Sequence, residues 1–216
     1  MARKILLIGA TGLVGGQAVG HLEAAGYDVR TLVRRSSGRT AKETIAPPER
    51  WPGLVGGTGA DVAICAIGTT MRAAGSQSAF RAVDYEIAVA FAGAARAAGI
   101  RHMIAVSSVG ADAGSRNFYL RTKGEMEQAL IGFGFDRLDI LRPGLLRGER
   151  GAERRPGERL GIALSPVVNL LLRGRLDRYA AIDSDKVAQA IGRLAELVEK
   201  GTHIHHNRDV RRIAAG

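Results

Sequence analysis

Residues 4–15 read KILLIGATGLVG, and this stretch decides the fold. The apolar run that ends at Ile8 is typical of a strand buried on both faces of a parallel sheet. Gly9, Gly12 and Gly15 follow at a spacing of three, and residues 13–25 then predict a helix closed by a glycine. A strand, a glycine turn and a helix in this order present free backbone N–H groups at a helix N-terminus. The stretch therefore predicts a phosphate site.

Each glycine of this turn has a separate role in such a site. Gly9 permits the turn, Gly12 lets the backbone approach a pyrophosphate, and Gly15 lets the helix pack close to the strand. The spacing is G-x-x-G-x-x-G, whereas many dehydrogenases have G-x-G-x-x-G. A tight turn with a purely structural role is the alternative. The position directly after the first strand favours a bound dinucleotide.

The end of the second predicted strand indicates which dinucleotide binds. Residues 28–33 form this strand, and Arg34 and Arg35 follow it. An acidic residue here would bind the ribose hydroxyls of NAD, whereas two guanidiniums offer a fork-shaped positive site for the 2′-phosphate of NADP. A solvated arginine pair at a strand end is the alternative. We expect NADP, with NADPH preferred over NADH.

Length and cysteine content limit the class of protein. A chain of 216 residues forms one domain with a substantial core and needs no disulfide or metal for stability. Its single cysteine, Cys65, lies in an apolar run and is expected to be a buried thiol, which suits a reducing compartment. No run reaches the roughly 18 apolar residues of a membrane span. These features predict a cytoplasmic protein without a membrane span.

The net charge of +10 raises the question of nucleic-acid binding. The arginines are interleaved with acidic residues, as in residues 147–159, and few aromatic residues are available to stack on bases. We therefore expect no specific nucleic-acid partner, a small-molecule substrate, and a monomer or homodimer. His203, His205 and His206 alternate in a late strand without a second ligand cluster, so no metal site is expected.

Strand and helix patterns alternate along the whole chain. This alternation predicts an α/β fold with a doubly wound parallel sheet, in one domain over residues 1–216. Residues 36–59 are short and rich in Gly and Pro, so the third strand and its helix are expected to be stunted. Residues 145–180 form a long excursion of the kind that carries substrate contacts or a lid. The predicted strands are 4–8, 28–33, 43–46, 61–66, 102–107, 137–141, about 178–182 and 203–206, and the predicted helices are 13–25, 78–98, 117–132, 160–172 and 184–199, with a short helix at the C-terminal end.

A second chemical motif follows the fifth predicted strand. This strand ends in Ser107 and Ser108, and Tyr119 and Lys123 come next in a predicted helix. A spacing of four places the phenol and the ammonium on one helix face. A nearby ammonium stabilises a phenolate, so the pair can exchange protons near neutral pH, while Ser108 holds the substrate oxygen. A chance Tyr-x-x-x-Lys match is the alternative; the glycine turn and the Ser-Ser strand end favour a catalytic role for Ser108, Tyr119 and Lys123.

Taken together, these motifs resemble the short-chain dehydrogenase/reductase superfamily, specifically its atypical members related to the extended, epimerase-like type. The resemblance rests on the glycine turn, the Arg-Arg pair, the Ser-Ser strand end, residues 119–125 and residues 141–144. A closer likeness is to the Tat-interacting-protein-like oxidoreductases, through residues 65–70, 117–119, 135–137 and 155–158. The resemblance runs from residue 4 to about residue 200.

The resemblance implies a Rossmann fold that binds NADP. It places Gly68, Thr69 and Thr70 near the adenosine half of the cofactor. It places Pro143 and Gly144 near the nicotinamide ring, and it gives Lys123 a hydrogen bond to the nicotinamide ribose. Together with the glycine turn, the expected cofactor contacts are Gly9, Thr11, Gly12, Leu13, Val14, Gly15, Arg34, Arg35, Ile67, Gly68, Thr69, Thr70, Ser107, Tyr119, Lys123, Pro143, Gly144 and Leu145.

Two departures from the family pattern affect this expectation. Asp84 occupies the region where many members carry an asparagine, which puts their usual water relay in doubt. The short segment 36–60 removes part of the expected adenine wall. The predicted activity is an NADP-dependent reduction or oxidation of a small carbonyl or alcohol. The alternatives are an NADPH-binding regulatory protein with little catalysis, and an epimerase- or dehydratase-like enzyme that keeps its cofactor bound.

Overall fold

The computed structural model describes residues 2–40, 42–148 and 174–216. Seven parallel strands form the main sheet in the order β3-β2-β1-β4-β5-β6-β9. The strand order reverses between β1 and β4, and such a switch point is where open α/β sheets bind ligands. The strands are β1 (Lys4–Ile8), β2 (Asp28–Val33), β3 (Glu43–Ile45), β4 (Val62–Cys65), β5 (His102–Val106), β6 (Arg137–Arg142) and β9 (Gly201–His206).

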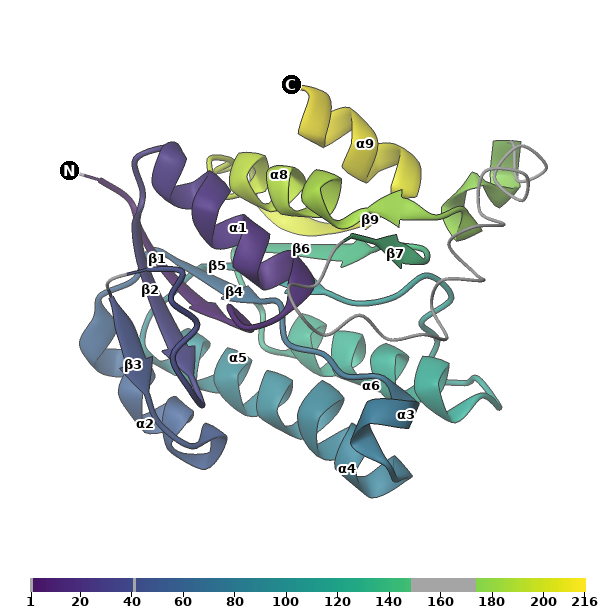
Figure 1. Ribbon diagram of the computed structural model, residues 1–216, viewed down its shortest axis with the longest axis horizontal. Helices are drawn as coiled ribbons and strands as arrows, with labels where there is room; N and C mark the ends of the chain where they lie inside the picture. The colour runs from purple at the N-terminus through teal and green to yellow at the C-terminus, as the bar shows by residue number, and fades with distance from the viewer. Residues whose placement is uncertain (1, 41, 149–173) are drawn as a thin grey trace.

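Helices cover both faces of the sheet (Figure 1). On one face lie α1 (Leu13–Ala24), α8 (Ser184–Leu194) and α9 (Asn207–Ala215), and on the other lie α2 (Trp51–Val55), α5 (Ala88–Ala97) and α6 (Phe118–Gly132). Successive residues of β1 alternate between the two cores: Leu7 packs in the first and Leu6 in the second. The central strands are therefore apolar throughout, as predicted for the first strand.

Short elements connect these layers. After β4 the chain forms α3 (Met71–Ala74) and α4 (Gln77–Arg81), and a π-helical turn, Ala82–Ile87, then leads directly into α5. Single 3-10 turns span Pro48–Arg50, Gly56–Thr58 and Gly174–Tyr179. Two short strands, β7 (Leu146–Arg147) and β8 (Ile182–Asp183), pair with each other outside the main sheet.

The predicted doubly wound parallel sheet is confirmed, and so is the stunted third unit, since β3 has three residues and α2 has five. The predicted strand at 178–182 is wrong. A 3-10 turn extends to Tyr179, and the strand β8 begins at Ile182 and, in the described part of the chain, pairs with β7 outside the main sheet. The predicted helix 184–199 ends at Leu194, because the chain must turn to bring Gly201 into register with Arg137. The predicted helix 160–172, and most of the excursion at 145–180, lie outside the described residues.

Candidate functional site

The glycine turn after β1 leaves no room for a side chain at Gly9 or Gly15. Gly9 has a φ of +96°, and a Cβ placed on it would lie 2.4 Å from the backbone carbon of Ala66. A Cβ on Gly15 would lie 2.2 Å from the carbonyl oxygen of Gly9. The Gly12 N–H donates to that same oxygen at 2.9 Å. The turn is thus pressed against the end of β4, which is why the first and third glycines are required.

The N-terminus of α1 is open to an anion. Its cap is Gly12, which has no side chain to accept from the orphan N–H groups, and the first turn carries no acidic residue. The first N–H groups of a helix have no partner within the helix, and they carry the positive end of its dipole. This end of α1 therefore has the character of a phosphate-binding turn.

A cavity of about 350 Å³ lies beside this turn, at the carboxyl ends of β1, β2 and β4. It brings together seven of the predicted cofactor contacts: Gly9, Thr11, Gly12, Arg34, Ile67, Gly68 and Thr69. Pro48 and Trp51 also line it, and sequence reasoning missed both. The short segment after β2 therefore contributes to the wall of the cavity, and the expectation that its shortness removes part of an adenine wall stays a prediction.

The remaining predicted contacts lie outside the lining of this cavity. Val14 and Gly15 are buried where α1 packs, and the Thr70 hydroxyl accepts from the Ala73 N–H at 3.1 Å as the cap of α3. Arg35 and Leu145 are exposed. Six further predicted contacts also lie outside the lining: Leu13, Ser107, Tyr119, Lys123, Pro143 and Gly144. The cofactor contacts of all these residues stay predictions.

Lys123 is buried and paired with an acidic residue. Its Nζ lies 2.7 Å from Oδ1 of Asp84, and both side chains are almost fully shielded from solvent. Burial disfavours the ammonium, but the charges of Asp84 and Tyr119 outweigh that penalty and raise the pKa of Lys123 above its ordinary value. A Cβ on Gly68, a cavity residue, would lie 3.8 Å from this Nζ. Gly68, which lines the cavity, is therefore a near neighbour of the buried ion pair.

Tyr119 lies one turn before Lys123 on α6 and is half-buried. Its ring packs against Phe80 with the centroids 5.3 Å apart. The α6 backbone approaches the preceding loop so closely that a Cβ on Gly124 would lie 2.1 Å from the Ala113 nitrogen. The glycine after Lys123 is therefore needed to seat the helix that carries both residues.

The two serines after β5 differ in their contacts. Ser107 is buried, and its hydroxyl has no hydrogen-bond partner among the described residues. The Ser108 hydroxyl donates to the neighbouring Val109 carbonyl at 3.3 Å, a long bond. A buried hydroxyl without a partner is costly, so Ser107 is suited to a ligand atom.

Asn207, at the start of α9, is a structural residue that sequence reasoning missed. It is fully buried; its amide oxygen accepts from the Gly144 N–H at 2.9 Å, and its amide nitrogen donates to the Ala180 carbonyl at 2.7 Å. A Cβ on Gly144 would lie 2.2 Å from that same carbonyl. Asn207 thus fixes the loop after β6, and asparagine at a helix start gave no signal of this long-range contact.

The three late histidines lie at β9, as their alternation predicted. His205 Nε2 lies 2.8 Å from Asp139 Oδ1, and His102 Nε2 lies 3.0 Å from Asp139 Oδ2. In the described part of the chain, no group of three or more His, Cys, Asp or Glu side chains could hold a metal ion. Cys65 is buried, and burial raises the pKa of its thiol to about 11, which fits a structural thiol.

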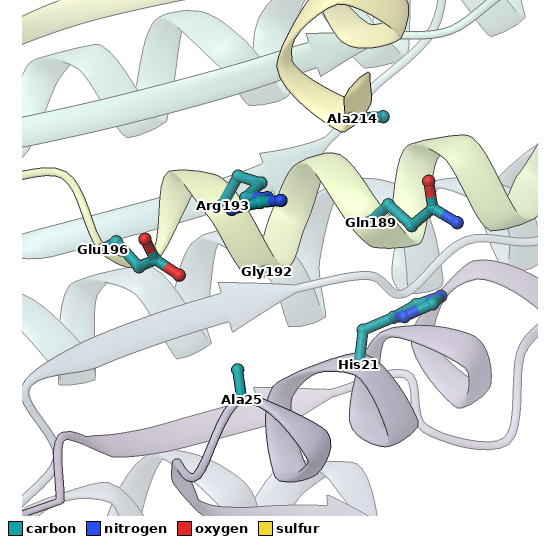
Figure 2. A pocket seen from close by; sticks show the side chains of 7 residues that line it. All are labelled: His21, Ala25, Gln189, Gly192, Arg193, Glu196 and Ala214. Carbon is teal, nitrogen blue, oxygen red and sulfur yellow. The ribbon is translucent and has the colours of Figure 1, made fainter. Parts of the chain in front are cut away.

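A second cavity, of about 340 Å³, lies among α1, α8 and α9 (Figure 2). Its lining residues are His21, Ala25, Gln189, Gly192, Arg193, Glu196 and Ala214. His21 Nε2 lies 2.6 Å from Asp185 Oδ1, which orients the imidazole. None of the predicted site residues lines this cavity, so it is separate from the glycine-turn site.

Among the residues that the structure describes, no helix is both long enough and apolar enough to cross a membrane.

The parallel sheet with helices on both faces is a Rossmann-like fold, and the glycine-turn cavity lies at its switch point. The chain belongs to the HIM1 family, whose family model matches residues 40–164. It is 36% identical to the protein FMP52 of Candida albicans over 84% of both chains. It is 34% identical to fmp52 of Aspergillus niger, over 87% of this chain and 84% of the relative.

Three solved structures of similar fold are described as containing NAD or NADP. A short-chain dehydrogenase/reductase superfamily protein from Agrobacterium tumefaciens with bound NAD matches with a TM-score of 0.72 and 18% identity, over 94% of this chain and 77% of that chain. The dTDP-4-dehydrorhamnose reductase of Bacillus anthracis, in complex with NADP, matches with a TM-score of 0.68 and 16% identity, over 100% and 81%. The UDP-glucose 4-epimerase of Thermus thermophilus with NAD matches with a TM-score of 0.70 and 16% identity, over 98% and 81%.

The prediction of a cytoplasmic protein is contradicted by these comparisons. Several relatives at 34–40% identity are named mitochondrial proteins. The prediction rested on a single cysteine and the lack of an apolar span, and these features distinguish reducing from oxidising compartments but do not identify one organelle.

Proposed function

We propose that the chain is an NADP-dependent oxidoreductase that transfers a hydride between the cofactor and the carbonyl or alcohol of a small organic substrate. The observation that carries this proposal is the position of Gly68, which lines the glycine-turn cavity and lies so near the Asp84–Lys123 pair that an added Cβ would be 3.4 Å from Asp84 Oδ1. This proximity supports a site in which phosphate binding and proton transfer occur at the same edge of the sheet.

The residues present fit a dinucleotide. The glycine turn packs closely against the end of β4, the uncapped α1 offers N–H groups, and the Ser107 hydroxyl has no partner within the described chain. The bound cofactor would supply the hydride from its nicotinamide ring. Solved neighbours with NAD or NADP support the cofactor class.

Two arginines support a preference for NADP. Arg34 lines the cavity, Arg35 follows it on the surface, and neither makes a hydrogen bond or ion pair with the described residues. Free guanidiniums at the end of β2 suit a 2′-phosphate, because they bind it through charge-assisted paired hydrogen bonds.

Proton transfer is assigned to α6 and the end of β5. Tyr119 donates a proton to the substrate oxygen during reduction, and the Ser108 hydroxyl positions that oxygen. Lys123 supplies the adjacent positive charge and would hold the nicotinamide ribose of a bound cofactor. The finer likeness to the Tat-interacting-protein-like oxidoreductases stays a prediction.

The test is NADPH oxidation across a panel of aldehydes, ketones and quinones, run beside a cofactor-binding titration. The proposal expects turnover on at least one panel member, with NADPH bound more tightly than NADH. Tight NADPH binding without turnover would favour the regulatory alternative. Oxidised cofactor retained through purification would favour the epimerase- or dehydratase-like alternative.

A further inference from the structure

Asp84 lies in the π-helical turn between α4 and α5, and only 1% of its surface is exposed. Turns of this kind widen a helix by one residue and are frequent at functional sites. A buried carboxylate requires strong partners, because its transfer from water is costly. The partners of Asp84 therefore indicate the role of the π-helical turn in the site.

The two carboxylate oxygens of Asp84 contact two different parts of the site. Oδ1 forms the ion pair with Lys123 at 2.7 Å, and Oδ2 accepts from the Thr69 N–H at 2.8 Å. Thr69 follows β4 and lines the glycine-turn cavity, whereas Lys123 belongs to α6. Val83, next to Asp84 on the turn, also lines the cavity. One carboxylate thus joins the cofactor wall to the proton-transfer helix.

We propose that Asp84 is a positioning residue of the dinucleotide site, which holds Lys123 in place as an ammonium and fixes the Thr69 backbone beside it. The inference rests on the proposed function, because that function identifies the site as one that binds a dinucleotide. The pairing itself can be measured without a cofactor.

Among the described residues, the titratable groups that act most strongly on Lys123 are Asp84 on the π-helical turn, Tyr119 on the same helix and Cys65 on β4. Asp84 is the partner in direct contact, at 2.7 Å. If its charge is removed, the ammonium remains buried without a counter-charge, and burial then lowers the pKa of Lys123. Lys123 would lose its proton at a lower pH than in the parent protein.

The first experiment compares melting temperatures of the apo protein and of the variants Asp84→Asn, Lys123→Met and the double variant. Lys123→Met leaves Asp84 buried without its counter-charge, which is more destabilising than the loss of both charges. We expect Asp84→Asn to raise the melting temperature of the Lys123→Met protein by about 2–4 °C or more. Glu127→Gln, which affects another buried acid on α6 that pairs with Arg142, is the matched control and should lower it.

A double variant that melts lower than Lys123→Met would overturn the pairing. If Lys123→Met yields no folded protein, recovery of folded protein in the double variant is the supporting result. Failure of both to fold leaves the decision to the second experiment, which uses Asp84→Asn alone.

The second experiment titrates NADPH into the parent and the Asp84→Asn protein between pH 6 and pH 9. Asparagine keeps an oxygen for the Thr69 N–H and removes the negative charge that faces Lys123. We expect NADPH affinity of the variant to fall about tenfold more than that of the parent between pH 7 and pH 9, as Lys123 loses its proton. Coincident pH profiles would overturn the inference. A parent protein that binds no NADPH at any pH would overturn the proposed function, while the melting comparison would still decide the pairing.

Discussion

Two buried aspartates in this molecule pair with cations in different settings, Asp139 within the sheet and Asp84 beside the glycine-turn cavity. Asp139 on β6 accepts from Arg137 at 2.6 and 2.8 Å and contacts His102 and His205, so its partners come from β5, β6 and β9. Asp84 contacts one ammonium and one backbone N–H. Asp139 thus ties three neighbouring strands together, whereas Asp84 ties a cavity wall to a helix.

This difference shows how a buried charge that stabilises the fold can be distinguished from one that positions a binding site. Both carboxylates are buried and both face cations, so burial and pairing alone do not distinguish them. Their partners do: Arg137 also donates to the Glu199 carbonyl at the edge of the sheet, whereas Thr69 lines the glycine-turn cavity. Substitution of Asp139 should therefore lower the free energy of unfolding, whereas substitution of Asp84 should lower NADPH affinity.

The largest expected effect is on stability at the Asp139 cluster. Asp139→Asn leaves the Arg137 guanidinium buried without its counter-charge, and breaking such a pair costs about 3–5 kcal/mol. Chemical denaturation should show this loss in the free energy of unfolding. NADPH affinity of the folded fraction should match the parent. A loss below about 1 kcal/mol would show that the cluster is not a structural support.

Tyr119→Phe tests the catalytic side of the comparison. The variant keeps the ring and its packing on Phe80 but loses the hydroxyl, so folding and NADPH binding should survive. Turnover should fall by roughly 10²–10⁴-fold, the usual contribution of positioned proton transfer. Tyr27→Phe, at the far end of α1, is the control and should retain parent turnover. A Tyr119→Phe protein as fast as the parent would exclude Tyr119 as the acid.

A smaller effect is expected when Arg34 and Arg35 are both replaced by alanine. Loss of charge-assisted contacts to the 2′-phosphate should weaken NADPH binding about tenfold or more, and NADH binding should barely change. Calorimetric titration measures both. Arg101→Ala, a surface arginine paired with Asp136, is the control. Equal affinity of the parent protein for the two cofactors would contradict the assignment of the arginine pair.

The smallest effect is the pH dependence of stability contributed by His102. Burial lowers the pKa of His102 below its ordinary value, and hydrogen bonding to Asp139 only partly offsets this. Because the folded state disfavours protonated His102, stability is fully present above about pH 6.5 and falls as the pH drops below it. One proton contributes at most about 1.4 kcal/mol per pH unit.

His102→Gln removes this titration and keeps an amide donor for Asp139. Unfolding curves at pH 7.5 and pH 5.5 should therefore differ less for His102→Gln than for the parent protein. Equal differences would show that His102 does not contribute to the acid sensitivity.

Local sequence was enough for the backbone features of the site. The strand and turn that require Gly9 and Gly15 lie within residues 4–15, so the spacing of the glycines was enough to predict the turn. Lys123 and Tyr119 were predicted for the same reason, because a four-residue spacing sets a helix face.

Contacts between distant segments could not be predicted in this way. Asp84 was recognised as a departure from a family pattern, but its ion pair depends on how a π-helical turn packs on α6. Trp51 and Asn207 reach their places only through the tertiary fold, 17 residues after Arg34 and 63 residues after Gly144. The strand predicted at 178–182 failed because a short apolar run has no periodicity that separates a strand from a turn.

Amide hydrogen exchange with and without NADPH tests the central claim most directly, because it locates the bound cofactor. The glycine-turn site predicts slower exchange over residues 9–16 and 66–70 at saturating NADPH, with no change around His21 and Gln189 at the second cavity. Unchanged exchange at the glycine turn, or slowing confined to the second cavity, would contradict the account.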